Sequence, residues 1–125
     1  MQKARTILVV EDEAPQMRLL TRILEQAGYN VVGAQNGVEA AETYRRRERE
    51  IDLVLSDMAL PKIGGWTVYM MLKEINPDVK VILMSGYLDE RVRAQLLDGG
   101  VKDFIPKPYE PDRIVTSVRQ ALTNA

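Results

Sequence analysis

Residues 6–12, TILVVED, and residues 51–57, IDLVLSD, share one pattern: a short aliphatic run that ends in acidic side chains. Similar runs rich in Ile, Val and Leu recur along the chain, without the polar–apolar alternation of a half-exposed strand. Near-continuous aliphatic runs of this kind are typical of strands buried on both faces of a parallel sheet. The sequence therefore predicts five strands: Thr6–Val10, Val31–Ala34, Ile51–Leu55, Val79–Met84 and Val101–Ile105.

Apolar residues at helical spacing follow each of these strands. Asn36 with Glu39 three residues later is a helix start of the capping-box kind. The predicted helices are Met17 to Ala27 with Gly28 as a left-handed cap, a segment that begins at Asn36, Trp66 to Ile75, Leu88 to Leu97, and Ile114 to Leu122. Five βα units in succession predict one α/β domain over residues 1–125, with a doubly wound parallel sheet and helices on both faces.

The composition excludes several classes of function. The chain has 125 residues, with 17 basic and 18 acidic side chains and a net charge of -1, so it lacks the basic surface on which direct nucleic-acid binding depends. No apolar run approaches the ~20 residues needed to span a bilayer, so we expect no membrane segment. Cysteine is absent, which excludes disulfides and makes a cytoplasmic location the expectation.

Histidine is also absent from the sequence. This excludes Ser-His-Asp and Cys-His triads, the usual zinc sites, and a kinase that phosphorylates its own histidine. Chemistry in this chain must therefore come from carboxylates, hydroxyls and amines, with oxygen ligands for hard cations.

Reactive side chains follow four of the five predicted strands. Glu11 and Asp12 come after the first strand, Asp57 after the third, Ser85 after the fourth and Lys107 after the fifth. The carboxyl ends of parallel strands share one edge of the sheet, which is where open α/β sheets bind ligands. Two carboxylates ~4 Å apart repel by about 4 kcal/mol at an effective dielectric near 20, so this acidic set favours a dication such as Mg²⁺.

These groups form a chemically consistent set for phosphoryl transfer. The metal neutralises an arriving phosphoryl group, Lys107 supplies a second positive charge, and the Ser85 hydroxyl can donate a hydrogen bond to a phosphoryl oxygen. The Asp57 carboxylate can then act as the nucleophile and form an aspartyl phosphate.

Four strings resemble, in order and spacing, the receiver domains of response regulators in bacterial two-component systems, including the chemotaxis receivers. They are ILVVEDE at 7–13, DMALP at 57–61, MSG at 84–86 and DFIPKP at 103–108, and the resemblance covers essentially the whole chain. It implies a flavodoxin-like (βα)5 fold with strand order 2-1-3-4-5. The stretch Lys62 to Gly65 departs from the family, and Gly64 puts the usual cap of the third helix in doubt.

The resemblance also implies a role for each site residue. Asp57 would accept the phosphoryl group. Asp12, Asp57 and the backbone carbonyl of Ala59 would bind Mg²⁺, with Glu11 assisting directly or through a water.

Three further positions carry expectations from the same resemblance. Ser85 and Lys107 would contact the phosphoryl group, and the Lys107–Pro108 peptide would be cis. Phe104 stands at the family's aromatic switch position: phosphorylation would pull Ser85 and the loop after the fourth strand toward the phosphate and let Phe104 turn inward. This would reshape the face made by the fourth helix, the fifth strand and the fifth helix.

The implied function is a phosphorylation-dependent signalling switch. A partner histidine kinase or phosphotransfer protein would supply the phosphoryl group from a phosphohistidine, and the domain would catalyse only its own phosphorylation and dephosphorylation. An output partner would bind the reshaped face, and a homodimer is one state that phosphorylation could produce.

Two alternatives belong to other classes. An α/β phosphatase or nucleotide-binding protein would turn over a phosphate ester, but no G-x-G-x-x-G or Walker lysine loop follows any strand. A degenerate receiver would act as an interaction module without phosphorylation. The presence of Asp57, Ser85 and Lys107 argues against this hypothesis. Assays of ester turnover and of phosphorylation distinguish the three hypotheses.

The residues two positions beyond Asp57 and Ser85 generate a prediction about the lifetime of the phosphoryl group. Hydrolysis needs a water in line with phosphorus; Ala59 cannot orient one through its side chain, and Tyr87 has the bulk to obstruct one. Ala59→Asn combined with Tyr87→Glu should speed dephosphorylation and leave Mg²⁺ affinity nearly unchanged. If Tyr87 instead packs away from the site, single-turnover decay of the double variant will match that of the parent.

Overall fold

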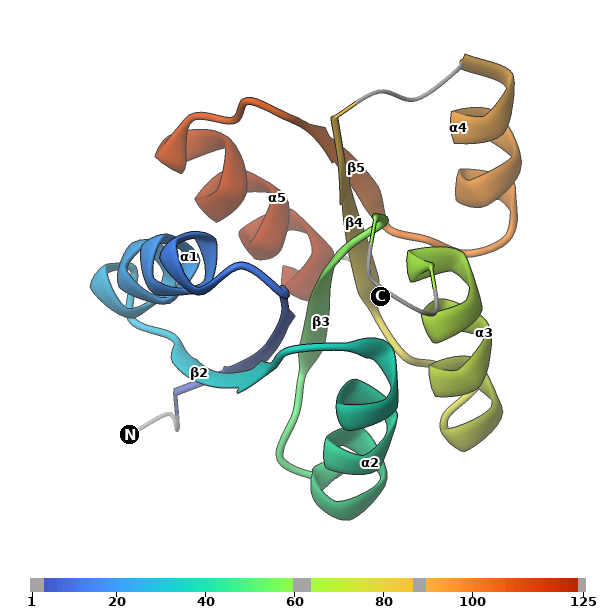
Figure 1. Cartoon of the computed structure of the whole chain (residues 1–125), viewed down its shortest axis with the longest axis horizontal. Coiled ribbons are helices and arrows are strands. Elements are labelled where there is room, and N and C mark those ends of the chain that lie inside the picture. Colours follow the sequence, from blue (N-terminus) through green and yellow to red (C-terminus); the bar gives the residue numbers. More distant parts are fainter. Residues whose placement is uncertain (1–3, 60–63, 87–89, 124–125) are drawn as a thin grey trace.

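The computed structural model describes residues 4–59, 64–86 and 90–123, and shows a parallel five-stranded sheet between two layers of helices (Figure 1). Helices α1 and α5 cover one face, and α2, α3 and α4 cover the other (Figure 1). The strand order β2-β1-β3-β4-β5 confirms the predicted fold. In chain order the elements are β1 (Thr6–Val10), α1 (Ala14–Gln26), β2 (Asn30–Ala34), α2 (Gly37–Arg47), β3 (Leu53–Asp57), α3 (Gly65–Ile75), β4 (Val81–Ser85), α4 (Glu90–Asp98), β5 (Asp103–Pro106) and α5 (Pro111–Thr123).

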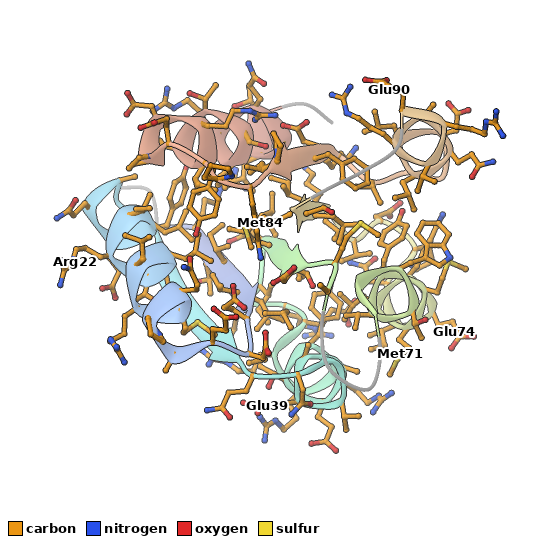
Figure 2. The ribbon with its side chains drawn as sticks, turned by 45° about the horizontal axis from the view of Figure 1, so that its top comes forward. Arg22, Glu39, Met71, Glu74, Met84 and Glu90 are labelled. Atoms are coloured by element: carbon orange, nitrogen blue, oxygen red, sulfur yellow. The ribbon has the colours of Figure 1, made fainter. Side chains whose placement is uncertain are left out.

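The sheet divides the core into two clusters, because successive side chains of a strand point to opposite faces. In β1, Ile7 and Val9 pack with α1 and α5, whereas Leu8 and Val10 pack with the α2–α3–α4 layer. Charged side chains such as Arg22 and Glu74 lie on the outer sides of the helices, whereas Met84 lies in the interior (Figure 2). No helix in the described part of the chain is both long and apolar enough to cross a membrane.

Three strands begin two residues later than predicted, at Leu53, Val81 and Asp103. The residues wrongly assigned to strand starts, Ile51, Val79 and Val101, are buried, but their N–H groups donate to the ends of the preceding helices or turns (Arg47, Asn76 and Leu96 carbonyls). Strands β3 and β4 also end later than predicted, so Asp57 and Ser85 are their last residues and do not belong to the loops after them.

Strand β2 also departs from the prediction of burial on both faces. It lies at the edge of the sheet, and of its five residues only Ala34 is buried. An edge strand has a neighbour on one side only, so an aliphatic sequence alone does not make it buried.

The helix ends follow the sequence signals. The Asn36 side chain accepts a hydrogen bond from the N–H of Glu39 (2.8 Å) at the start of α2. Gly28, after α1, has the left-handed φ of 97° that was expected. At the start of α3, Gly64 provides no side-chain cap, as the departure in this stretch suggested.

Candidate functional site

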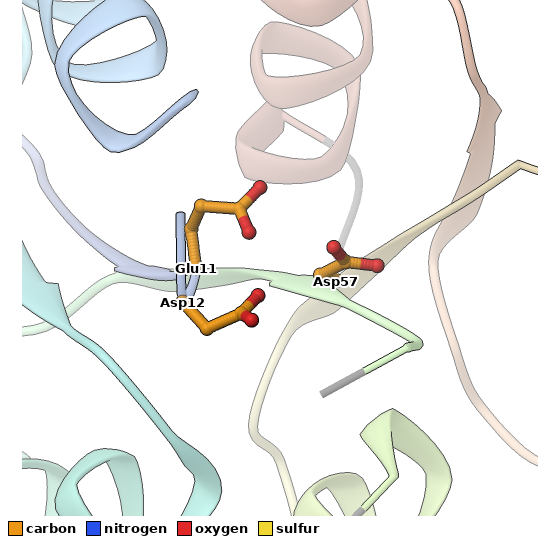
Figure 3. Close-up of side chains that lie close together, drawn as sticks. All are labelled: Glu11, Asp12 and Asp57. Atoms are coloured by element: carbon orange, nitrogen blue, oxygen red, sulfur yellow. The ribbon is translucent and has the colours of Figure 1, made fainter. Parts of the chain in front are cut away.

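Three carboxylates from two strands meet at the carboxyl edge of the sheet. Oxygens of Glu11, Asp12 and Asp57 all lie within 4.8 Å of one another, and Figure 3 shows the carboxylates of Glu11 and Asp12 extending toward the side on which Asp57 lies. Glu11 and Asp12 follow β1 directly, and Asp57 ends β3, which pairs with β1. Glu11 is 2% exposed and Asp57 is 4% exposed, whereas Asp12 is exposed to solvent. The predicted convergence of these three residues is therefore present.

Lys107 is brought to the same place by the loop after β5. Its Nζ lies 2.7 Å from Asp57 Oδ2 and forms an ion pair with it. The other Asp57 oxygen, Oδ1, accepts a hydrogen bond from the backbone N–H of Ala59 (3.0 Å). The Lys107–Pro108 peptide is cis, as expected. Both oxygens of the candidate acceptor are thus oriented before any ligand arrives.

The crowding of charges raises the pKa of two groups, for different reasons. Burial and the nearby Asp57 charge raise the pKa of Glu11 from 4.5 to about 7. Burial would lower the pKa of Lys107, but the hydrogen bond and charge of Asp57 outweigh it, and the pKa is raised. Without a bound cation, the site therefore favours a proton on Glu11 and a charged Lys107.

The acidic cluster fits a small hard cation. Oxygens that bind Mg²⁺ at about 2.0–2.1 Å are at most about 4 Å apart. The carboxylate oxygens of the cluster lie within 4.8 Å of one another, which is close to this distance. All of the candidate ligands are oxygens, and the sequence offers no imidazole or thiolate ligand because it has neither histidine nor cysteine. The Ala59 carbonyl belongs to the residue whose N–H binds Asp57, so it is a further candidate on the same loop.

Ser85, at the end of the neighbouring strand β4, lies beside this cluster and borders a separate cavity together with Phe104. Ser85 directly follows Met84, which pairs with Asp57 in the sheet. The Ser85 carbonyl accepts a hydrogen bond from the N–H of Lys107 (2.8 Å). Ser85 and Phe104 both line a cavity of about 430 Å³ between α4, β5 and α5. The Phe104 ring packs in the core of the α2–α3–α4 layer and is 3% exposed, so in this structure it is already turned inward.

An ion pair that the sequence did not indicate holds the backbone of Phe104. Arg113 on α5 binds Asp103 Oδ2 and the Phe104 carbonyl, each at 2.9 Å, and Ser117 donates to the same Asp103 oxygen (2.6 Å). Burial would raise the pKa of Asp103, but the hydrogen bonds from Arg113 and Ser117 lower it. Strand β5 is therefore fastened to α5 next to the expected switch residue.

Two other contributions to the site were missed. A Cβ on Gly65 would lie 2.7 Å from Met58 Cα and 2.8 Å from the Asp57 carbonyl oxygen, so α3 can approach the acceptor only with glycine at its first residue. A glycine inside the helix, where it is disfavoured relative to alanine, was the available signal. The Tyr109 hydroxyl donates to Gln16 Oε1 (3.1 Å) and links the Lys107 loop to α1.

Part of the expected site falls outside the described residues. These are Leu60 and Pro61 of the acceptor string, and Tyr87, on which the expectation of a long-lived phosphoryl state partly rests.

The sequence matches the family model described as response regulator receiver domain over residues 7–119. The chain is 33% identical over 117 residues to the chemotaxis protein CheY of Thermotoga maritima, covering 93% of this chain and 96% of that protein. It is 35% identical over 117 residues to the sensor kinase CckA of Brucella abortus, where the match covers 94% of this chain and 12% of the kinase.

A solved structure shares the whole architecture. The structure described as the CheX–CheY–BeF3–Mg²⁺ complex from Borrelia burgdorferi contains a chain that matches with a TM-score of 0.91 and 28% identity. The match covers 96% of this chain and 90% of that chain.

The raised pKa of Glu11 predicts how stability depends on pH in the metal-free protein. Between about pH 4.5 and about pH 7 the folded state keeps a proton on Glu11 that the unfolded chain has lost, so the free energy of unfolding falls as pH rises through this window. Glu11→Gln should remove this contribution and reduce the slope, measured by urea unfolding with a chelator present. Glu25→Gln, at an exposed carboxylate of α1, is the matched control. Equal slopes for Glu11→Gln and the parent would contradict the assignment.

Proposed function

The chain belongs to the response regulator receiver domain family of two-component systems, and from this premise we propose that Asp57 accepts a phosphoryl group from a phosphohistidine of a partner histidine kinase or phosphotransfer protein. One observation carries the proposal: a buried carboxylate at the end of β3 lies 2.7 Å from a lysine and within 4.8 Å of two further carboxylates. A purely structural Asp–Lys pair would not need two more negative charges beside it.

The chemistry of the step follows from the orientation of Asp57. One carboxylate oxygen forms the new P–O bond while the P–N bond to the donor imidazole breaks, and the electron pair of that bond leaves with the imidazole nitrogen. The Ala59 N–H holds Oδ1, so Oδ2, whose partner is the flexible Lys107 side chain, is the oxygen that is easier to free. Lys107 can then pair with the phosphoryl oxygens, since Arg and Lys charges stabilise a transferring phosphoryl group.

Mg²⁺ would be held by Asp12, Asp57 and the Ala59 carbonyl, with Glu11 assisting, and when bound it supplies positive charge that offsets the carboxylates and the incoming phosphoryl group. The similar Borrelia burgdorferi structure is described as containing BeF3 and Mg²⁺ together. Beryllofluoride and a dication are the pair that an aspartate site of this composition would bind, which supports the same ligands here.

A donor can reach the site from the side of α1. A groove of about 530 Å³ beside the site is lined by Glu13, Gln16, Leu19, Lys107, Pro108 and Tyr109. It lies between α1 and the loop that carries the lysine, so a partner seated there would be next to Asp57. The output change is proposed for the other side, where Ser85 borders the cavity under α4.

Because Phe104 is buried in this structure, we do not require an inward turn of its ring for the output change. The proposal is that phosphorylation draws Ser85 toward the phosphoryl group and thereby alters the cavity lined by Glu90, Arg93 and Phe104.

The acceptor assignment predicts a single site of phosphorylation. Incubation with Mg²⁺ and acetyl phosphate should add one phosphoryl group to the parent protein, and Asp57→Asn should abolish the addition because the nucleophilic carboxylate is gone. Intact-protein mass spectrometry measures the product. Asp98→Asn, at an exposed carboxylate of α4, should label like the parent. Unchanged labelling of Asp57→Asn would remove Asp57 from this role.

The metal assignment predicts opposite effects of one substitution with and without Mg²⁺. Asp12→Ala removes a repelling charge, so the metal-free variant should melt higher by about 3 °C, the shift expected for ~1 kcal/mol in a domain of this size. The same variant should lose most of the stabilisation that Mg²⁺ gives the parent. Glu13→Gln, a neighbouring carboxylate outside the cluster, serves as control in thermal melts at several Mg²⁺ concentrations. An equal Mg²⁺-dependent shift in Asp12→Ala and the parent would show that the site is wrong.

A further inference from the structure

Helix α4 is packed against the domain chiefly through its C-terminal end. Among its nine described residues only Leu96, in the last turn, is buried (5% exposed). Toward the other end, Glu90 and Arg93 line the cavity of about 430 Å³ that lies between α4, β5 and α5. Figure 2 shows Glu90 at the outer end of the helix. The described part of α4 thus has a buried contact at one end and a cavity at the other.

The C-terminal end of α4 is also held by hydrogen bonds from α3. The carbonyl of Gly99, directly after α4, accepts from the Tyr69 hydroxyl (3.0 Å) and from Lys73 Nζ (3.1 Å). The last carbonyls of a helix have no partner within it and carry the negative end of its dipole, so a hydroxyl and a cation stabilise them. Helices α3 and α4 lie side by side at this end (Figure 1).

The side chains that supply these bonds support one another along α3. The ring centres of Trp66 and Tyr69 are 5.4 Å apart, and Lys73 Nζ lies 5.6 Å from the centre of the Tyr69 ring. Their spacing of three and four residues places all three on one side of the helix. Tyr69 is buried, so its hydroxyl has a fixed position.

The two glycines after α4 allow this close contact. A Cβ on Gly100 would lie 2.5 Å from the Tyr69 hydroxyl oxygen, and one on Gly99 would lie 3.2 Å from Trp66 Cη2. Gly100 also has a φ of +110°, which other residues rarely adopt. The backbone therefore both turns and contacts α3 at the same two residues.

We propose that Tyr69 and Lys73 are positioning residues of the switch, which fix the C-terminal end of α4 so that α4 moves by rotating about Gly99–Gly100. The proposal rests on the proposed function, because phosphorylation of Asp57 is the event that would move the helix. Ser85 and Gly86 line the same cavity as Glu90 and Arg93, so a change at the phosphoryl site reaches the N-terminal half of α4 first. The anchored end then acts as the hinge.

Hydrogen–deuterium exchange tests the anchor with and without a phosphoryl mimic. The amides of Gly99, Gly100 and Val101 are hydrogen-bonded to carbonyls of α4 and report on its end. In the parent, beryllofluoride with Mg²⁺ should change exchange at residues 90–93 and leave these three amides unchanged. In Tyr69→Phe/Lys73→Met, which keeps the ring and the aliphatic stem, exchange at the three amides should rise about tenfold without ligand and should become sensitive to beryllofluoride.

A matched control removes the same chemical groups elsewhere. Tyr44→Phe/Lys80→Met loses a buried hydroxyl that accepts from Asn76 and a lysine that binds the Leu122 carbonyl in the last turn of α5, so it measures the effect of lost stability without removing a bond to the Gly99 carbonyl. Exchange at residues 99–101 that is equal in the two double variants would overturn the proposal, as would a beryllofluoride response spread evenly along α4 in the parent. If beryllofluoride changed no amide in the parent, the proposed function would fail, and the ligand-free comparison would still decide whether Tyr69 and Lys73 anchor α4.

Discussion

The ion pair between Lys107 and Asp57 is the constraint on which the carboxyl edge of the sheet depends. Two carboxylates 4 Å apart repel by about 4 kcal/mol even at a dielectric near 20, and three of them meet here within 4.8 Å. The lysine offsets one negative charge, and the raised pKa of Glu11 lets a proton offset another. The loop after β5 must therefore reach across to β3, and its hydrogen bonds to Ser85 and Gln16 hold it there.

Local sequence patterns were sufficient for the βα architecture and for the acidic cluster, and the family resemblance supplied the strand order. Aliphatic runs predict strands, helical spacing predicts the helices between them, and parallel strands gather the residues at their carboxyl ends. The strand boundaries were less accurate, since Ile51, Val79 and Val101 are as apolar as true strand residues. Whether an apolar residue gives its N–H to a helix end or to the sheet is decided by the tertiary fold.

What could not be predicted depends on contacts between distant parts of the chain. Gln16 and Tyr109 are 93 positions apart, and neither residue type alone indicates a contact. The approach of Gly65 to the Asp57 carbonyl depends on the path of α3 over β3. The buried position of Phe104 follows from the packing of the whole α2–α3–α4 layer, which no single motif encodes.

The separation of the core into two clusters has a mechanical consequence. Phe104, Tyr69 and Leu96 all belong to the cluster on the α2–α3–α4 side, whereas Ile105, next to Phe104, belongs to the cluster with α1 and α5. The backbone of the sheet lies between the two clusters, because successive side chains of a strand point to opposite faces. Substitutions within one cluster should therefore leave the packing of the other largely unchanged, except near Phe104, whose carbonyl binds Arg113 of α5.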